Sequence, residues 1–158
     1  MSTIFSGSEI VEIGIEIEKN GKAFYEEVLK NASDDNAEVI FKYLANEEGK
    51  HIAVFEEILD SVKKYEPIEA YPGEYFSYMK ALANEHVFTK KDVGVSIAKE
   101  LKDDSGAIDV GIKFEKESII FYEGMKKVVP EVEHKLLDSL IEQEQVHLSK
   151  LEALRENF

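Results

Sequence analysis

Hydrophobic residues recur at the spacing of a helix face through both ends of this 158-residue chain. In the first half this periodicity predicts one helix over about residues 7–31 and a second over about 35–65. Ser6-Gly7-Ser8-Glu9 has the spacing of a capping box and predicts where the first helix begins. The side chains expected to face a core are Ile10, Ile13, Ile17, Phe24 and Val28, followed by Val39, Ile40, Tyr43, Leu44, Ile52, Phe55 and Leu59.

The second half predicts two further helices, over about 105–128 and 131–157. Asp103-Asp104-Ser105 supplies the cap of the first, and Pro130 is expected in the first turn of the second. Between the two halves, residues 66–104 form a connection with only short amphipathic stretches, much longer than the loop of an antiparallel helix pair. The pattern predicts a single all-α domain over 1–158, a ferritin-like four-helix bundle of two helical hairpins joined by a long, partly helical crossover.

The two halves also repeat each other. At an offset of 97 residues, identical pairs are Gly14/Gly111, Ile15/Ile112, Glu18/Glu115, Lys19/Lys116, Phe24/Phe121, Tyr25/Tyr122, Glu26/Glu123 and Lys30/Lys127. At an offset of 96, Leu44/Leu140, Glu48/Glu144 and His51/His147 are paired. These identities are too many for composition alone. They indicate that one motif, with its polar residues, occurs twice in the chain.

Each repeat contains a Glu-x-x-His pair, Glu48–His51 and Glu144–His147. Residues three apart on a helix project the same way, so each pair can offer one carboxylate and one imidazole to a common site. Glu18 and Glu115 add one carboxylate each from the partner helices, as terminal ligands, while Glu48 and Glu144 bridge. Four carboxylates balance two divalent ions, and oxygen-rich coordination with two imidazoles suits iron, with manganese possible.

Two tyrosines lie on the same helix faces as the predicted ligands. Tyr25 and Tyr122 follow Glu18 and Glu115 by seven residues, which is two helical turns. A buried phenol there can donate a hydrogen bond to a ligand carboxylate or to the oxidant, and so assist catalysis from outside the metal shell. A core tyrosine whose hydroxyl is satisfied elsewhere is the equally weighted alternative.

Other candidates lack the support of the repeat. Glu131 and His134 have the same spacing as the two pairs but no counterpart in the first half, and His134 is expected to be exposed. Glu47 aligns with Gln143, so it is placed outside the ligand set. His86 is assigned to packing or to the surface of the crossover.

Charge and composition narrow the function classes. A net charge of −14 argues against nucleic-acid binding and against docking on anionic lipid. The chain contains no cysteine, which excludes disulfides and iron held by thiolates within it. No membrane-spanning or signal segment is recognised, so a cytoplasmic location is expected.

The motifs resemble those of the rubrerythrin-like branch of the ferritin-like superfamily, in its short form without a rubredoxin domain. The segments that carry the resemblance are Glu-x-x-Gly-x-x-Phe-Tyr at 18–25, Leu-Ala-Asn-Glu-Glu-Gly-Lys-His at 44–51 and Glu-Gln-Val-His-Leu at 144–148. The resemblance implies a role in oxidative stress and two iron ions, oxo- or hydroxo-bridged when oxidised, that reduce hydrogen peroxide or oxygen. It also implies a homodimer and, because cysteine is lacking, a separate electron donor such as a rubredoxin.

One position departs from that family pattern. Rubrerythrins usually carry an additional Glu one turn after the ligand that Glu115 resembles, and here that position is Ser118. The remaining six-residue set also resembles the sites of ferritin and bacterioferritin. An iron-binding or ferroxidase protein for iron handling, without efficient peroxide turnover, is therefore the alternative to an enzyme of rubrerythrin type.

Overall fold

The computed structural model describes residues 7–65, 73–127 and 129–158, and every regular element in them is helical. Along the chain the elements are α1 (Gly7–Lys30), α2 (Asp35–Tyr65), α3 (Gly73–Glu85), α4 (Val93–Glu100), α5 (Asp104–Met125), the 3₁₀ turn η1 (Glu131–Glu133) and α6 (His134–Arg155). The predicted capping box includes Ser6, which lies outside the described residues. Asp103 caps α5 as expected, since its carboxylate accepts a hydrogen bond of 2.8 Å from the backbone N–H of Gly106.

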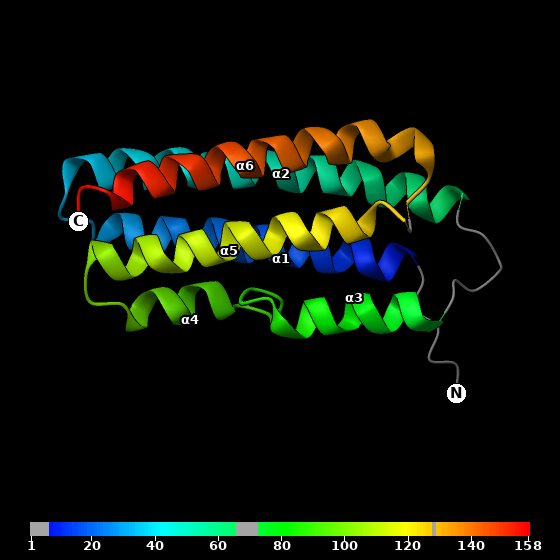
Figure 1. Cartoon of the computed structure of the whole chain (residues 1–158), viewed down its shortest axis with the longest axis horizontal. Helices are drawn as coiled ribbons and strands as arrows, with labels where there is room; N and C mark the ends of the chain where they lie inside the picture. The colour runs from blue at the N-terminus through cyan, green and yellow to red at the C-terminus, as the bar shows by residue number, and fades with distance from the viewer. Residues whose placement is uncertain (1–6, 66–72, 128) are drawn as a thin grey trace.

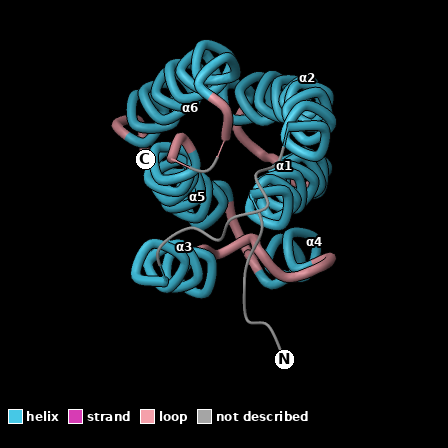
Figure 2. The backbone as a smooth tube through the Cα atoms, turned by 90° about the vertical axis from the view of Figure 1, so that its right-hand side faces the viewer, coloured by secondary structure: helices cyan, strands magenta, loops and turns pink. Residues whose placement is uncertain are grey.

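The four long helices form a bundle of two hairpins, α1–α2 and α5–α6 (Figure 1). Viewed along the bundle, α2 and α6 lie on one side, and α1 and α5 lie between them and the two short helices (Figure 2). Of these, α3 packs against α5, and α4 packs against α1. The structure confirms the predicted all-α, ferritin-like arrangement, with the crossover laid along one side of the bundle.

The apolar stripes predicted from periodicity meet inside the bundle. The fully buried large side chains are mostly aromatic and include Phe24, Phe41, Phe55, Phe114 and Phe121. Burying an aromatic side chain contributes on the order of 2–3 kcal/mol, so these layers supply much of the energy that stabilises the bundle. They also flank the centre of the molecule, where polar side chains are buried.

Three predicted details are wrong. Val39 is 65% exposed, because it borders a groove between α2 and the end of α6. Tyr43 is 36% exposed, and its ring lies beneath Nζ of Lys150, at 5.1 Å from the ring centroid. Pro130 has extended backbone, with ψ at 144°, and it therefore precedes the helical turns. The short turn η1 follows, and α6 begins at His134 rather than near residue 131.

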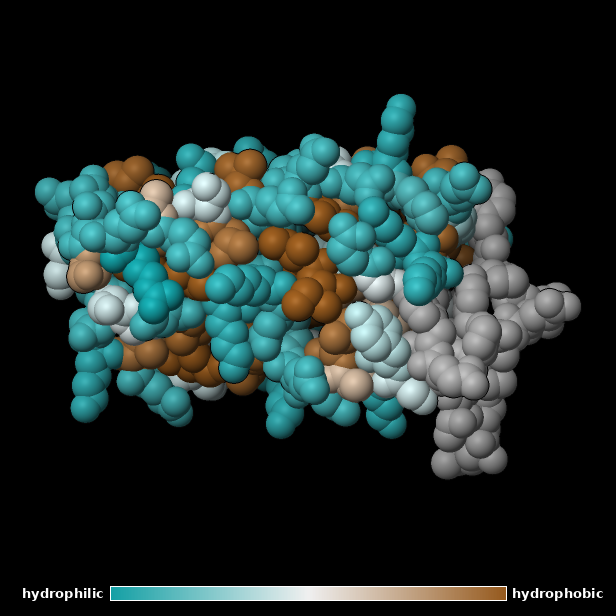
Figure 3. All heavy atoms as spheres, in the orientation of Figure 1, coloured by the Kyte–Doolittle hydropathy of each residue, from teal (hydrophilic) through white to brown (hydrophobic). Residues whose placement is uncertain are grey.

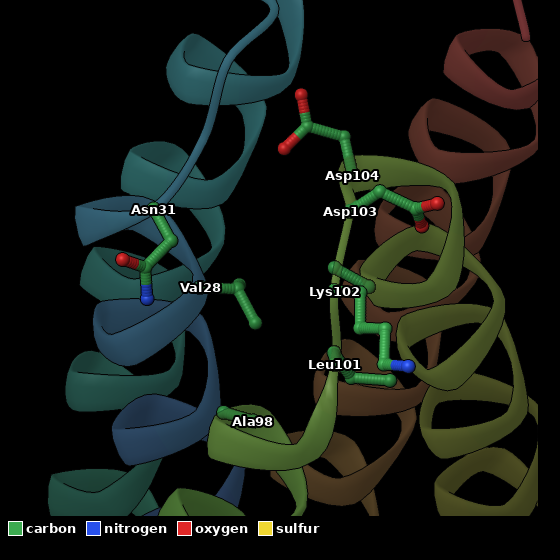
Figure 4. Close-up of a pocket in the computed structure, with 8 residues that line it drawn as sticks. Val28, Asn31, Ala98, Leu101, Lys102, Asp103 and Asp104 are labelled. Atoms are coloured by element: carbon green, nitrogen blue, oxygen red, sulfur yellow. The ribbon is translucent and has the colours of Figure 1, made fainter.

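The end of the bundle that holds the α1–α2 turn is tied to the start of α5. The carboxylate of Asp104 accepts hydrogen bonds from the backbone N–H groups of Ser33, at 3.0 Å, and Asp34, at 2.8 Å. Beside them, Val28, Asn31 and Leu101 border a cavity of about 30 Å³ (Figure 4). That volume suits a water molecule and nothing much larger, so we assign this cavity to packing.

The crossover is fastened to α1 by Asn20. Its amide NH₂ donates to the carbonyl oxygens of Phe88 and Lys90, both at 2.7 Å, and its carbonyl oxygen accepts from the N–H of Gly94 at 3.0 Å. A Cβ at Gly94 would overlap the backbone carbonyl of Asn20, so only glycine permits α4 to begin this close to α1. The side chain of Asn20 thereby fixes the loop between α3 and α4.

On the face shown in Figure 3, hydrophilic residues predominate, with apolar side chains visible between them. This pattern agrees with the net charge of −14. Among the described residues, no helix combines the length and the hydropathy that crossing a bilayer requires.

Replacing Asn20 with Ala should destabilise the protein strongly. The change removes three hydrogen bonds and leaves carbonyls of the crossover without partners, so the free energy of unfolding should fall by about 3 kcal/mol. Tm should fall by about 9 °C for a chain of this size, followed by circular dichroism. Asn46→Ala, at an exposed position of α2, is the control and should change stability by less than about 0.5 kcal/mol. Equal melting of the two variants would contradict this role of Asn20.

Candidate metal centre

The six polar residues singled out by the repeat meet in the middle of the bundle. Each is at most 1% exposed, and they come from all four long helices: Glu18 from α1, Glu48 and His51 from α2, Glu115 from α5, and Glu144 and His147 from α6. Buried carboxylates without compensating charge are very costly. Their convergence therefore calls for cations or protons among them.

Two overlapping groups of donor atoms can be distinguished. One consists of Glu18, Glu48, His51 and Glu144, and the other of Glu48, Glu115, Glu144 and His147. Within each group one donor atom from every residue lies within 4.8 Å of the others. Because Glu48 and Glu144 belong to both groups, the arrangement is that of two neighbouring metal positions with two shared carboxylates.

The imidazoles face the carboxylates through the same ring nitrogen. Nδ1 of His51 lies 2.7 Å from Oε1 of Glu144 and 3.5 Å from Oε2 of Glu18. Nδ1 of His147 lies 3.3 Å from Oε1 of Glu48 and 3.6 Å from Oε1 of Glu115. The two rings stack, with centroids 5.4 Å apart, as expected for equivalent residues of a two-fold repeat.

Unpaired buried atoms test whether this set fits metal ions. Among the described residues, the buried side-chain nitrogen and oxygen atoms without a hydrogen-bond partner all belong to this cluster, where the close approaches of imidazole to carboxylate lack hydrogen-bond geometry. They are both oxygens of Glu48 and Glu144, one oxygen each of Glu18 and Glu115, Nδ1 of both histidines, and Nε2 of His147. Unsatisfied buried polar atoms are rare in proteins, so a whole set that points inward fits ligation. Two free oxygens suit a bridging carboxylate, and one suits a terminal ligand.

Without metal, protons take over part of the charge compensation. Burial alone lowers the pKa of an imidazole, but the neighbouring carboxylates Glu144 and Glu48 outweigh it and raise the pKa of His51 to about 11. The pKa of His147 is raised to about 12, because Glu115, Glu144 and Glu48 outweigh the effect of burial. Burial and the charge of Glu144 raise the pKa of Glu115 well above its usual value. Both imidazoles are thus cationic in the metal-free protein at neutral pH.

The two predicted tyrosines each contact a terminal carboxylate from the opposite hairpin. The phenol of Tyr25 donates to Oε1 of Glu115 at 2.9 Å, and the phenol of Tyr122 donates to Oε1 of Glu18 at 2.5 Å. Burial and the nearby carboxylates raise the pKa of both phenols, so they stay protonated and act as donors. Each bond occupies one carboxylate oxygen and leaves the other free to face the cluster.

The remaining sequence candidates lie away from the donor atoms. His134 is half-buried rather than exposed, because its Nε2 lies 3.2 Å from the carbonyl oxygen of Val129 and the ring rests on the turn before α6. Glu131, in η1, is exposed and joins neither group. His86 is buried within the crossover, which is one of the two roles expected for it.

Two contacts around the cluster were not predicted from the sequence. Oε1 of Gln143 lies 2.7 Å from Nε2 of His51, and Ser118 meets Nε2 of His86 at 3.0 Å. The alignment of Gln143 with Glu47 was a usable signal for the first contact. The second joins two segments of unrelated sequence, and periodicity gives no hint of it.

Comparison with known proteins agrees with this architecture. The family model described as Rubrerythrin matches residues 9–155. A protein of Thermotoga maritima, described as ferritin-like and diiron-carboxylate, superposes with a TM-score of 0.74 at 21% identity, covering 99% of this chain and 98% of its own. A search of curated proteins finds no match to this chain.

The stability of the metal-free protein should fall as pH rises above neutrality. Folded His51 and His147 hold protons up to pH about 11 and about 12, whereas unfolded histidines lose them near pH 6.5. Between those limits the native state binds more protons than the unfolded state, so the free energy of unfolding decreases with pH. Chelated protein should therefore melt at a lower temperature at pH 9 than at pH 7, measured by calorimetry. An increase in Tm over this range would contradict the cationic assignment.

Proposed function

This chain belongs to the rubrerythrin family, and we propose that it is a di-iron carboxylate oxidoreductase that reduces hydrogen peroxide or oxygen with electrons from a separate donor. The observation that carries the proposal is the set of inward-facing, unpaired donor atoms in the bundle. When bound, two ferrous ions would supply the two electrons that, with two protons, convert one hydrogen peroxide to two waters.

The six buried residues are proposed as the ligands. Glu18 and His51 would hold one ion, Glu115 and His147 would hold the other, and Glu48 and Glu144 would be shared by both. Six ligand residues that provide oxygen and imidazole nitrogen, without thiolate, suit iron and also admit manganese. The buried carboxylates neutralise two divalent ions, which makes the interior position of both tolerable.

The protein contributes geometry and exclusion of water. Tyr25 and Tyr122 hold the terminal carboxylates in place, each through a hydrogen bond to one oxygen. Phe55 packs on the ring of Tyr122, with centroids 4.9 Å apart, and Phe114 packs on Tyr25 at 5.9 Å. These aromatic contacts keep solvent from the phenols, so their protons remain directed at the ligands.

The electron supply must come from outside these 158 residues, because they contain no cysteine that could hold an iron–thiolate centre. We propose a separate small redox protein such as a rubredoxin as the donor. A cytoplasmic homodimer remains the expected form of the protein.

The alternative function is iron binding and oxidation without efficient peroxide turnover. Ser118 favours it, because this serine stands where the resemblance leads one to expect a further carboxylate, and the two donor groups of the described residues together contain six residues. A protein of this type would oxidise Fe(II) with oxygen and pass the iron on. The oxidant preferred by the loaded protein distinguishes the two functions.

Replacing His51 with Ala should leave one metal position. The variant should bind one Fe(II) per chain instead of two, measured anaerobically by a colorimetric iron assay after gel filtration. His134→Ala is the matched control, because Glu131–His134 has the same spacing as the proposed ligand pairs but lies outside the cluster. It should retain two ions. Two ions in His51→Ala would refute the ligand assignment.

Stopped-flow mixing of the Fe(II)-loaded protein with hydrogen peroxide or oxygen tests the reaction. Oxidation followed by near-ultraviolet absorption should be at least tenfold faster with peroxide than with oxygen at equal concentration, roughly 1.4 kcal/mol in activation free energy. Faster oxidation by oxygen would support the iron-handling function instead. Absence of any absorption change would refute both.

A further inference from the structure

The two metal positions have equivalent ligands but different surroundings. One position combines Glu18 with His51, and the other combines Glu115 with His147. Glu48 and Glu144 belong to both. Removing a residue that hydrogen-bonds to a metal ligand typically weakens metal binding by about 10–100-fold. A comparison of these outer contacts therefore shows whether the repeat produces two equal positions.

At the first position, the imidazole has an outer partner. With Nδ1 of His51 directed at the carboxylates, Nε2 is free to donate to Oε1 of Gln143 at 2.7 Å. The amide NH₂ of Gln143 donates to Oγ of Ser139, one helical turn earlier, at 3.2 Å. Both ends of the Gln143 amide are therefore engaged, with Oε1 facing the histidine and the NH₂ facing Ser139.

At the second position, the equivalent partner is engaged elsewhere. The repeat places Glu47 opposite Gln143, but Oε1 of Glu47 accepts from the phenol of Tyr43 at 3.2 Å and Oε2 pairs with Nζ of Lys50 at 3.0 Å. Val146 occupies the place of Lys50 in the other repeat, so Gln143 has no such competitor. Nε2 of His147 is buried without a partner.

The surroundings of the two terminal carboxylates also differ, and again the Glu18–His51 position has the additional polar contacts. Tyr122, which donates to Glu18, is backed by Ser118 one turn earlier on α5, and Nε2 of His86 lies 3.0 Å from Oγ of Ser118. The N–H of Phe88 donates to Nδ1 of His86 at 3.0 Å, so the neutral ring carries its proton on Nε2. His86 thus donates to Ser118, which lies one turn before Tyr122, so a chain of polar side chains extends from the crossover to Glu18.

No such chain supports the other carboxylate. Tyr25 donates to Glu115, but the repeat counterpart of Ser118 is Gly21. The ring of Phe114 occupies the space where a side chain at Gly21 would lie. Tyr25 is consequently backed by an apolar ring rather than by a hydroxyl.

We propose that these unequal outer contacts make the Glu18–His51 position the tighter of the two and the first to fill, with Gln143, Ser118 and His86 as its positioning residues. The inference rests on the two-metal ligand assignment of the proposed function but is independent of the oxidant. It assigns Glu47 a latent role as a partner of His147, which its contacts with Tyr43 and Lys50 suppress. The metals would thus load in a defined order.

Two variants that each leave one position allow a direct comparison. His147→Ala retains the Glu18–His51 position, and His51→Ala retains the Glu115–His147 position. Titrated with Co(II) and followed by calorimetry and by the visible cobalt spectrum, His147→Ala should bind its ion about tenfold more tightly than His51→Ala. Equal affinities, or the reverse order, would overturn the proposal.

Changes to the outer residues identify the cause. In the His147→Ala background, Gln143→Leu should weaken Co(II) binding about tenfold, and Gln143→Glu, which keeps an acceptor, should restore it. In the His51→Ala background, Glu47→Gln should tighten binding about tenfold, because a neutral amide gives up Lys50 and can accept from His147. A gain in affinity cannot arise from misfolding. Absence of both effects would show that the outer contacts do not set the order.

Two variants of His86 test whether the crossover contributes to metal affinity at the Glu18–His51 position. His86→Gln keeps an N–H directed at Ser118, whereas His86→Asn keeps only the acceptor for the N–H of Phe88. Co(II) affinity in the His147→Ala background should fall about threefold for His86→Asn and stay unchanged for His86→Gln. Equal losses in both variants would refute the role of His86.

Anomalous diffraction from the unmodified protein with one equivalent of Co(II) provides the final check. Density should appear beside Glu18 and His51 before the second position fills. Failure of the protein to bind Co(II) or Fe(II) at all would also remove the proposed function, whereas ordered loading without oxidation would remove only the oxidoreductase assignment.

Discussion

The burial of four carboxylates beside two imidazoles is the constraint on which this structure depends. In a low-dielectric interior, isolated carboxylates would repel one another and lose their hydration at a cost that no small domain can bear. The fold tolerates them because each negative group faces a proton or a position suited to a cation. The raised pKa values of the two imidazoles are a consequence of this constraint, because the metal-free bundle retains protons where the loaded bundle would hold metal.

The helical framework gives the cluster its shape. Four helices bring the donor atoms together from four directions, and aromatic layers keep water away from them. The crossover adds a second function to its role as a connection, since Asn20 holds its loop against α1 and the same loop presents His86 to Ser118. A segment that joins the hairpins therefore also contributes a contact close to the buried cluster.

Sequence periodicity and the internal repeat were sufficient for the fold and for the residues that converge. Both signals are carried by the chain itself: helix faces repeat at fixed spacing, and two copies of one motif must occupy equivalent places. The exposure of Val39 and Tyr43 could not be read in this way, because periodicity marks an apolar stripe without showing where the neighbouring helix stops covering it. The contact of His86 with Ser118 depends on a loop conformation and on side-chain rotamers, which spacing does not determine.

Covalent linkage of the two hairpins has an evolutionary consequence. Were the same bundle assembled from two identical hairpins, every substitution would appear twice, and both halves of the centre would change together. Here each hairpin has its own codons, so Gln143 and Glu47, or Ser118 and Gly21, could diverge while the motifs around them stayed alike. Joining the copies into one chain frees each half to change by single mutations.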